Sequence, residues 1–181
     1  MAEMDKKLND LKVLLAEIND LEMAAALLGW DQLTYMPSGG AEARGRQMAT
    51  LAKISQEKFI DPALGKMLDD LRPYQESLPY DSDDASLIRV TRVDYERALK
   101  VPPEFLAELN IHSTDAYQAW AEARPANDFS KVRPYLEKTL DLSRKYADFF
   151  PGYENIADPL IDVSDFGMKA SSIRKLFAEL R

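Results

Sequence analysis

The sequence of 181 residues is 46% hydrophobic and 30% charged, a composition typical of one soluble globular domain and unlike that of a disordered chain. Its formal net charge of −8 argues against nucleic acid or an anionic membrane surface as a partner. The absence of cysteine excludes disulfides, thiolate zinc sites, iron–sulfur clusters and a cysteine nucleophile, and it is compatible with the cytosol.

The sequence shows no targeting or membrane-spanning segment. Residues 1–12, MAEMDKKLNDLK, are charged from the start and lack the apolar stretch of a secretion signal. No apolar run approaches the roughly 20 residues that a helix needs to cross a bilayer. We therefore expect a cytoplasmic protein.

The first predicted helix covers residues 5–34. Its apolar positions recur at helical spacing and are Leu8, Leu11, Leu15, Ile18 and Leu21. Residues 23–28 are then apolar on nearly all sides, which is typical of a helix that enters a core. Pro37 and the two glycines after it predict a sharp turn, followed by a second helix over residues 41–59.

A third helix is expected to begin at Asp61 and Pro62, because an N-cap acid followed by proline is a strong helix start. We expect it to end before Pro73, and we expect a polar, proline-bearing loop over residues 74–82.

The fourth helix is predicted to run to about residue 100. Three residues could cap it, namely Ser82, Asp83 and Asp84. Two prolines then break the chain and open a fifth helix over residues 104–123, which should end at Arg124 and Pro125.

A sixth helix is predicted to begin at Asn127 and Asp128. It tolerates Pro134 if that residue lies in the first turn, and it should end at Pro151. The segment over residues 153–167 is expected to be irregular or briefly helical.

Ser171 or Ser172 is expected to cap a last helix, SIRKLFAELR, which ends without a C-cap, so the chain looks truncated. No strand-like alternation and no repeat period occurs in the sequence. The sequence therefore predicts an all-α fold, a bundle of helical hairpins joined at proline and glycine corners, with residues 1–181 as a single domain.

His112, in the segment LNIHSTDAYQ, is the single histidine of the chain. Zinc hydrolysis requires two or three histidine or carboxylate ligands and an acid/base group near the bound water. Because neither HExxH nor a related spacing surrounds His112, we expect this side chain to be structural or solvated.

Other motifs of catalysis are absent from the sequence. The acids within residues 81–84 lack the glycine and glutamate spacing of a calcium loop, and a capping role fits them better. No GxSxG accompanies His112, and Gly39–Gly40 lacks the pattern of a phosphate loop, so a corner is the favoured role. The residues by themselves predict no catalytic and no metal-binding site.

A resemblance to a known family begins at residues 28–59, LGWDQLTYMPSGGAEARGRQMATLAKISQEKF. These residues resemble the N-terminal helical region of the thermostable (Taq-type) zinc metallocarboxypeptidases, which typically carry a W-D-x-x-T-Y-M-P-x-G-G-x-x-x-R pattern. The similarity continues through IRVTRVDYERALKVPPEF and residues 113–150, and it extends to FGMKASSIRKLFAEL near the end. The match weakens at residues 155–166, where NIADPLIDVSDF differs from the acidic linker usual in the family.

The resemblance implies a larger, almost wholly helical enzyme, usually a homodimer, that releases C-terminal amino acids from peptides. In that family an HExxH helix and a downstream glutamate bind zinc, and the HExxH glutamate acts as general base. These residues belong to the family's C-terminal half, beyond the position of Arg181. We therefore assign no catalytic and no metal-binding residue, and we expect no zinc bound to this chain.

Our functional prediction is the N-terminal helical region of such an enzyme, catalytically inactive alone, that forms a cleft wall, a lid or subunit contacts. The candidates for the cleft or interface side are Trp30, Asp31, Tyr35 and Arg44, for which core and corner roles stay open. Its expected partner is a second copy or the missing C-terminal half, with peptide substrate only in a full-length enzyme.

Two alternatives remain. The first is a stand-alone helical module that binds a partner or itself through an exposed apolar face. The second is an independent enzyme that uses carboxylates, which would require a cleft with paired acids of perturbed pKa.

Overall fold

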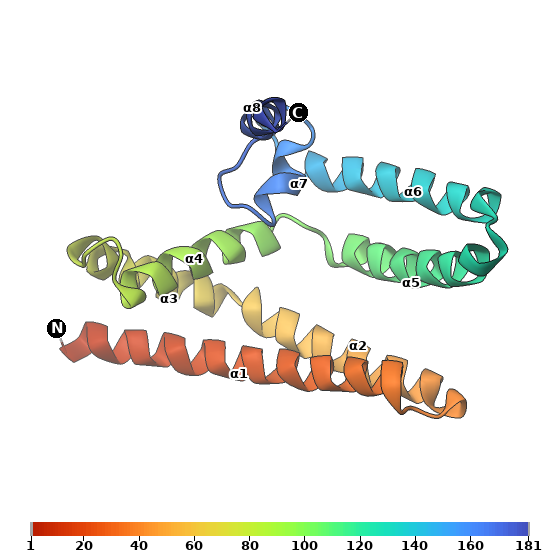
Figure 1. Ribbon diagram of the computed structural model, residues 1–181. Coiled ribbons are helices and arrows are strands. Elements are labelled where there is room, and N and C mark those ends of the chain that lie inside the picture. Colours follow the sequence, from red (N-terminus) through yellow and green to blue (C-terminus); the bar gives the residue numbers. More distant parts are fainter. Residues whose placement is uncertain (1, 181) are drawn as a thin grey trace. The chain divides into compact units, whose positions relative to one another are not determined.

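The computed structural model describes residues 2–180, and in this range the chain forms helices α1 to α8 and the short 3-10 helix η1, with no strand (Figure 1). The predicted all-α fold is confirmed. The chain divides into two compact units, of which the first ends at Leu99 and the second begins at Lys100. The prediction of a single domain over residues 1–181 stays a prediction. Within the described range, no helix combines the length and the apolar character that a bilayer span requires.

The first unit begins with a long helical hairpin. Helix α1 (Ala2–Thr34) is followed by η1 (Ser38–Gly40), and α2 (Ala41–Phe59) returns alongside α1 (Figure 1). The predicted second helix is confirmed at both ends, and α1 begins three residues before the predicted start at residue 5.

Helices α3 (Pro62–Ser77) and α4 (Asp83–Ala98) complete the first unit. Asp61 caps α3 as predicted, because its carboxylate accepts the Ala63 N–H at 2.7 Å. Of the three possible caps of α4, the structure selects Ser82, whose hydroxyl accepts the Ala85 N–H at 3.3 Å.

The predicted end of α3 before Pro73 is wrong, and the predicted loop over residues 74–82 is confirmed only over residues 78–82. Helix α3 contains Pro73 and continues to Ser77. A proline removes only one N–H from the helical ladder, and the next residue, Tyr74, packs against the core of the unit and donates its hydroxyl to Asp5 at 3.4 Å. This packing outweighs the local preference of proline.

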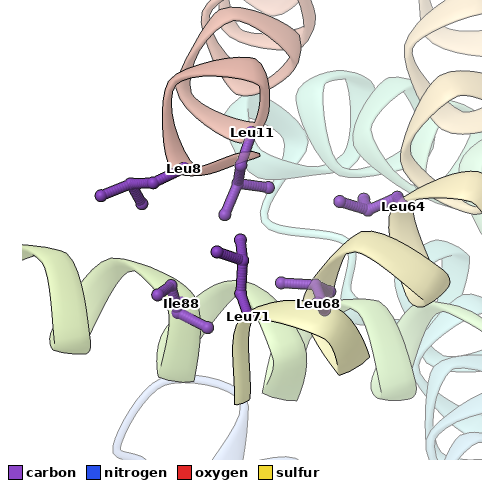
Figure 2. Close-up of a cluster of buried hydrophobic side chains, with 6 residues drawn as sticks. All are labelled: Leu8, Leu11, Leu64, Leu68, Leu71 and Ile88. Carbon is purple, nitrogen blue, oxygen red and sulfur yellow. The ribbon is translucent and has the colours of Figure 1, made fainter. Parts of the chain in front are cut away.

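The core of the first unit is a cluster of aliphatic side chains from three helices: Leu8, Leu11, Leu64, Leu68, Leu71 and Ile88. Figure 2 shows Leu11 of α1 directed toward Leu71 of α3. Each of these side chains is buried, and full burial of such a side chain contributes about 1.5–3 kcal/mol. The cluster therefore fixes the N-terminal half of α1 on α3 and α4.

The second unit contains a hairpin of α5 (Pro103–Ala126) and α6 (Phe129–Asp148), which lie side by side (Figure 1). Its core cluster consists of Val101, Phe105 and Leu142, with aromatic side chains such as Phe149 packed against it. The ring centroids of Phe105 and Phe149 are 5.1 Å apart in an edge-on arrangement.

Two further proline-based predictions in this hairpin are wrong. Helix α5 passes Pro125 and ends at Ala126, and its C-cap Asn127 adopts the left-handed conformation with φ of 50°. Helix α6 contains Pro134 beyond its first turn, and it ends at Asp148, before Pro151. In both helices the single missing N–H leaves the rest of the ladder intact.

The second unit ends with α7 (Asp158–Asp162) and α8 (Ala170–Glu179), so the prediction of a briefly helical segment over residues 153–167 is confirmed. The predicted serine cap of the last helix is wrong, because α8 begins one residue before Ser171. The buried carboxylate of Asp158 takes the capping role and accepts the Ala170 N–H at 2.8 Å.

Candidate functional site

The four candidate residues meet at the corner between α1 and α2. Trp30 and Asp31 lie in the last turns of α1, Tyr35 follows that helix directly, and Arg44 lies in the first turn of α2. Pro37 and the glycines of η1 reverse the chain between them. The structure therefore brings the candidates together, as the spacing of the motif requires.

Arg44 connects the two helices of this corner. Its guanidinium donates one hydrogen bond to the Leu28 carbonyl and another to the Asp31 carboxylate, the latter at 2.6 Å. The arginine side chain is 14% exposed and that of Asp31 is 37% exposed. The Asp31 carbonyl in turn accepts the Tyr35 and Met36 N–H groups, both at 2.9 Å. Asp31 and Arg44 thus stabilise the corner, and Arg44 Nε is buried without a hydrogen-bond partner.

Trp30 and Tyr35 are exposed at the same corner. Their ring centroids are 5.6 Å apart with an interplanar angle of 63°, an edge-to-face pair. Trp30 is 55% exposed and Tyr35 is 75% exposed, so neither ring lies in a core of this chain. Exposed aromatic side chains on a braced corner are suited to contact another molecule or segment.

A shallow hollow beside the corner was not predicted from the sequence. It has a volume of about 570 Å³, and its lining residues are Leu28, Ala43, Arg46, Gln47, Thr50 and Leu51. Arg46 pairs with Glu42 at 2.6 Å along the exposed side of α2. The lining residues form no sequence motif, because they meet only where two helices lie side by side.

Perturbed pKa values occur away from the corner, at ion pairs and helix caps. The hydrogen bond from Lys7 lowers the pKa of Asp70, and the hydrogen bond from the Ala170 N–H lowers that of Asp158. The hydroxyl of Ser130 lowers the pKa of Asp128. A carboxylate general acid requires a raised pKa, so these shifts indicate structural roles and give no support to the reading of an independent carboxylate enzyme.

His112 is buried between α5 and α6 and takes part in a structural contact. Its Nε2 lies 2.8 Å from the Thr139 hydroxyl, and its ring stacks on Tyr135 at a centroid distance of 6.2 Å. Because Thr139 donates its own proton to the Tyr135 carbonyl, it accepts the hydrogen bond from His112 Nε2–H.

The described residues do not fit a catalytic zinc site. Among residues 2–180, no three His, Cys, Asp or Glu side chains are placed together so that they could hold a metal ion. The chain's one histidine is already engaged with Thr139.

Comparison with known proteins relates this chain to one family of metallopeptidases. Residues 10–181 match the model of the carboxypeptidase Taq (M32) metallopeptidase family. The chain is 35% identical over 173 residues to thermostable carboxypeptidase 1 of Thermus thermophilus, an alignment that covers 89% of this chain and 33% of that protein. It is 28% identical over 168 residues to carboxypeptidase 1 of Bacillus subtilis, with 93% and 33% covered.

Solved structures show the same relationship. The M32 carboxypeptidase of Deinococcus radiodurans superposes with a TM-score of 0.80 at 41% identity, covering 97% of this chain and 35% of that chain. The Pyrococcus furiosus carboxypeptidase superposes with a TM-score of 0.83 at 26% identity, covering 96% and 34%. The chain spans about a third of the length of the curated relatives it matches.

Proposed function

Because this chain belongs to the carboxypeptidase Taq (M32) metallopeptidase family, we propose that it acts as the N-terminal helical part of a zinc carboxypeptidase that releases C-terminal amino acids from peptides. The observation that carries this proposal is the match of residues 10–181 to the family, combined with coverage of only about a third of each relative. The remaining two thirds would supply the metal ligands and the general base.

Within such an enzyme the corner between α1 and α2 would form part of a cleft wall, a lid or a subunit contact. The exposed edge-to-face pair of Trp30 and Tyr35 supports this role, since the hydrogen bonds of Arg44 brace the backbone beneath it. Homodimer formation and a cytoplasmic location stay predictions.

A chimeric enzyme tests the proposed function. Residues 1–181 would replace the matching third of the Deinococcus radiodurans carboxypeptidase, to which they are 41% identical. We expect the chimera to release the C-terminal amino acid of a blocked dipeptide in the presence of zinc, and we expect the 181-residue chain alone to release none. The matched control is the same chimera with the general-base glutamate of the host replaced by glutamine. A folded chimera without activity, beside an active host enzyme, would contradict the proposal.

The alternative function is a stand-alone helical interaction module. The exposed apolar side chains of α1, such as Leu27 and Trp30, favour it, because an open apolar face is typical of a binding surface. The intact mass of the gene product in its own cells separates the two functions. A product far larger than 20.5 kDa supports the carboxypeptidase, and a product of that mass supports the module.

A further inference from the structure

The sequence of α1 indicates burial on all sides over residues 23–30. Residues 23–30, MAAALLGW, contain no charged side chain. A helix that is apolar all round is normally surrounded by other elements, because any side left open places apolar surface in water. The sequence therefore predicts cover on every face of this segment.

Within the described part of the first unit, α2 covers one side of this segment. Helix α2 lies along α1, where Ser55 donates to Glu22 at 3.1 Å and Lys58 pairs with Glu17 at 2.9 Å. A different side of α1 carries Met23, Leu27 and Trp30 at helical spacing, and these side chains are 56%, 64% and 55% exposed. We call these three residues the outer face of α1. The expectation that residues 23–28 enter a core is therefore wrong for Met23 and Leu27.

The outer face is part of a well-held helix end. Arg44 bonds to the Leu28 carbonyl and to Asp31, and Trp30 packs edge-on against Tyr35. Its exposure therefore belongs to an ordered helix, and a frayed terminus does not account for it.

We propose that the outer face of α1 packs against the polypeptide that corresponds to the remaining two thirds of the M32 relatives, supplied in cis or in trans. This inference rests on the proposed function and names the surface through which the chain contacts the rest of that enzyme. The relatives carry about twice as much polypeptide as the part that this chain matches, which is enough to cover an apolar face. A second copy is disfavoured as the occupant, because each copy has a net charge of −8.

The absence of cysteine makes the inference directly testable by thiol labelling. Leu27→Cys would be introduced into the 181-residue chain and into the chimeric enzyme, in a host whose own cysteines have been replaced. We expect iodoacetamide to label the Leu27→Cys thiol at least about tenfold more slowly in the chimera than in the chain alone. The control is Val90→Cys on α4, which is 55% exposed and should keep a similar rate in both.

Each outcome decides the inference. Equal labelling of Leu27→Cys in a folded chimera and in the chain alone overturns it. If the Leu27→Cys thiol of the chain alone is protected from labelling, and the protection rises with protein concentration, a second copy covers the face. If the protection is the same at every concentration, the chain itself covers the face. Both results overturn the inference. A folded chimera that protects Leu27→Cys but hydrolyses no peptide supports this inference and contradicts the proposed function. A chimera that hydrolyses peptide but leaves Leu27→Cys unprotected supports the proposed function and overturns this inference.

A second measurement applies if the chimera does not fold. Leu27→Lys in the 181-residue chain should leave its thermal midpoint within about 2 °C of the parent, because an open face accepts a charged side chain. A marked fall of the midpoint would mean that this chain already covers the face, which overturns the inference.

Discussion

At the scale of single residues, two arginines two positions apart on α2 differ in what they contact. Arg44 is mostly buried and bonds to the Leu28 carbonyl and Asp31 of the other helix. Arg46 is exposed and pairs with Glu42 on its own helix. This contrast makes Arg46 a matched control for Arg44.

We predict that Arg44→Met lowers the free energy of unfolding by about 1–2 kcal/mol, because the substitution removes two charge-assisted hydrogen bonds from a largely buried site. Arg46→Met should change it by less than about 0.5 kcal/mol, as is usual for exposed pairs one turn apart. Urea denaturation at neutral pH measures both. Equal effects of the two substitutions would show that the Arg44 contacts do not brace the corner.

Asp158 gives a pH-dependent prediction. The Ala170 N–H bonds to its carboxylate and lowers its pKa in the folded state, while in the unfolded chain the pKa is about 3.9. The stabilisation is therefore present above the unfolded pKa and is lost as the pH falls through the folded pKa. Asp158→Asn should destabilise the chain at pH 7 and make little difference in strong acid.

Denaturant midpoints measured from pH 7 downward test this prediction for Asp158→Asn. The control is Asp165→Asn, at an exposed position of the same segment, which should shift the midpoint much less at pH 7. A stability difference for Asp158→Asn that is the same at all pH values would contradict the assigned role of the carboxylate.

At the scale of helices, the sequence predicted the hairpins well, whereas the helix ends that it placed at Pro73 and Pro125 were wrong. The apolar spacing of α1 and the Asp61 cap depend on neighbours in sequence, so both were predictable. The helix end predicted before Pro73 was wrong because Tyr74, the next residue, has its packing partners on other helices. Local rules contain no information about such distant partners.

The candidate site was also predictable only where it depends on neighbours in sequence. The spacing of Trp30, Asp31, Tyr35 and Arg44 around Pro37 was sufficient to predict that they share a corner. The exposure of the two aromatic rings could not be predicted, because it depends on which side of α1 is left uncovered by α2.

We predict that Tyr74→Ala shortens α3 at Pro73, since the last turn of the helix would lose the packing that holds it beyond the proline. Amide hydrogen exchange of residues 76–78 should accelerate by at least about tenfold. Tyr74→Phe retains the ring and should leave exchange near the parent rate. Unchanged exchange in Tyr74→Ala would show that the turn persists without the ring.

At the scale of the whole molecule, this chain is a family member that spans a third of its relatives' length. Each of its two units has its own buried cluster. Large apolar side chains remain exposed in both units, among them Leu27 in the first and Phe129 in the second. This distribution is expected under the function proposed above, in which further polypeptide would cover these side chains.

The Asp158 carboxylate also closes a loop. Its two oxygens accept N–H groups from Asn155 and Ala170, and Lys169 pairs with Glu154 at 2.6 Å across the same closure. These contacts join the start of α7 to the start of α8, and breaking one of them strains the others. Local opening of this segment must release both helix starts together, so α7 and α8 form one cooperative unit of unfolding.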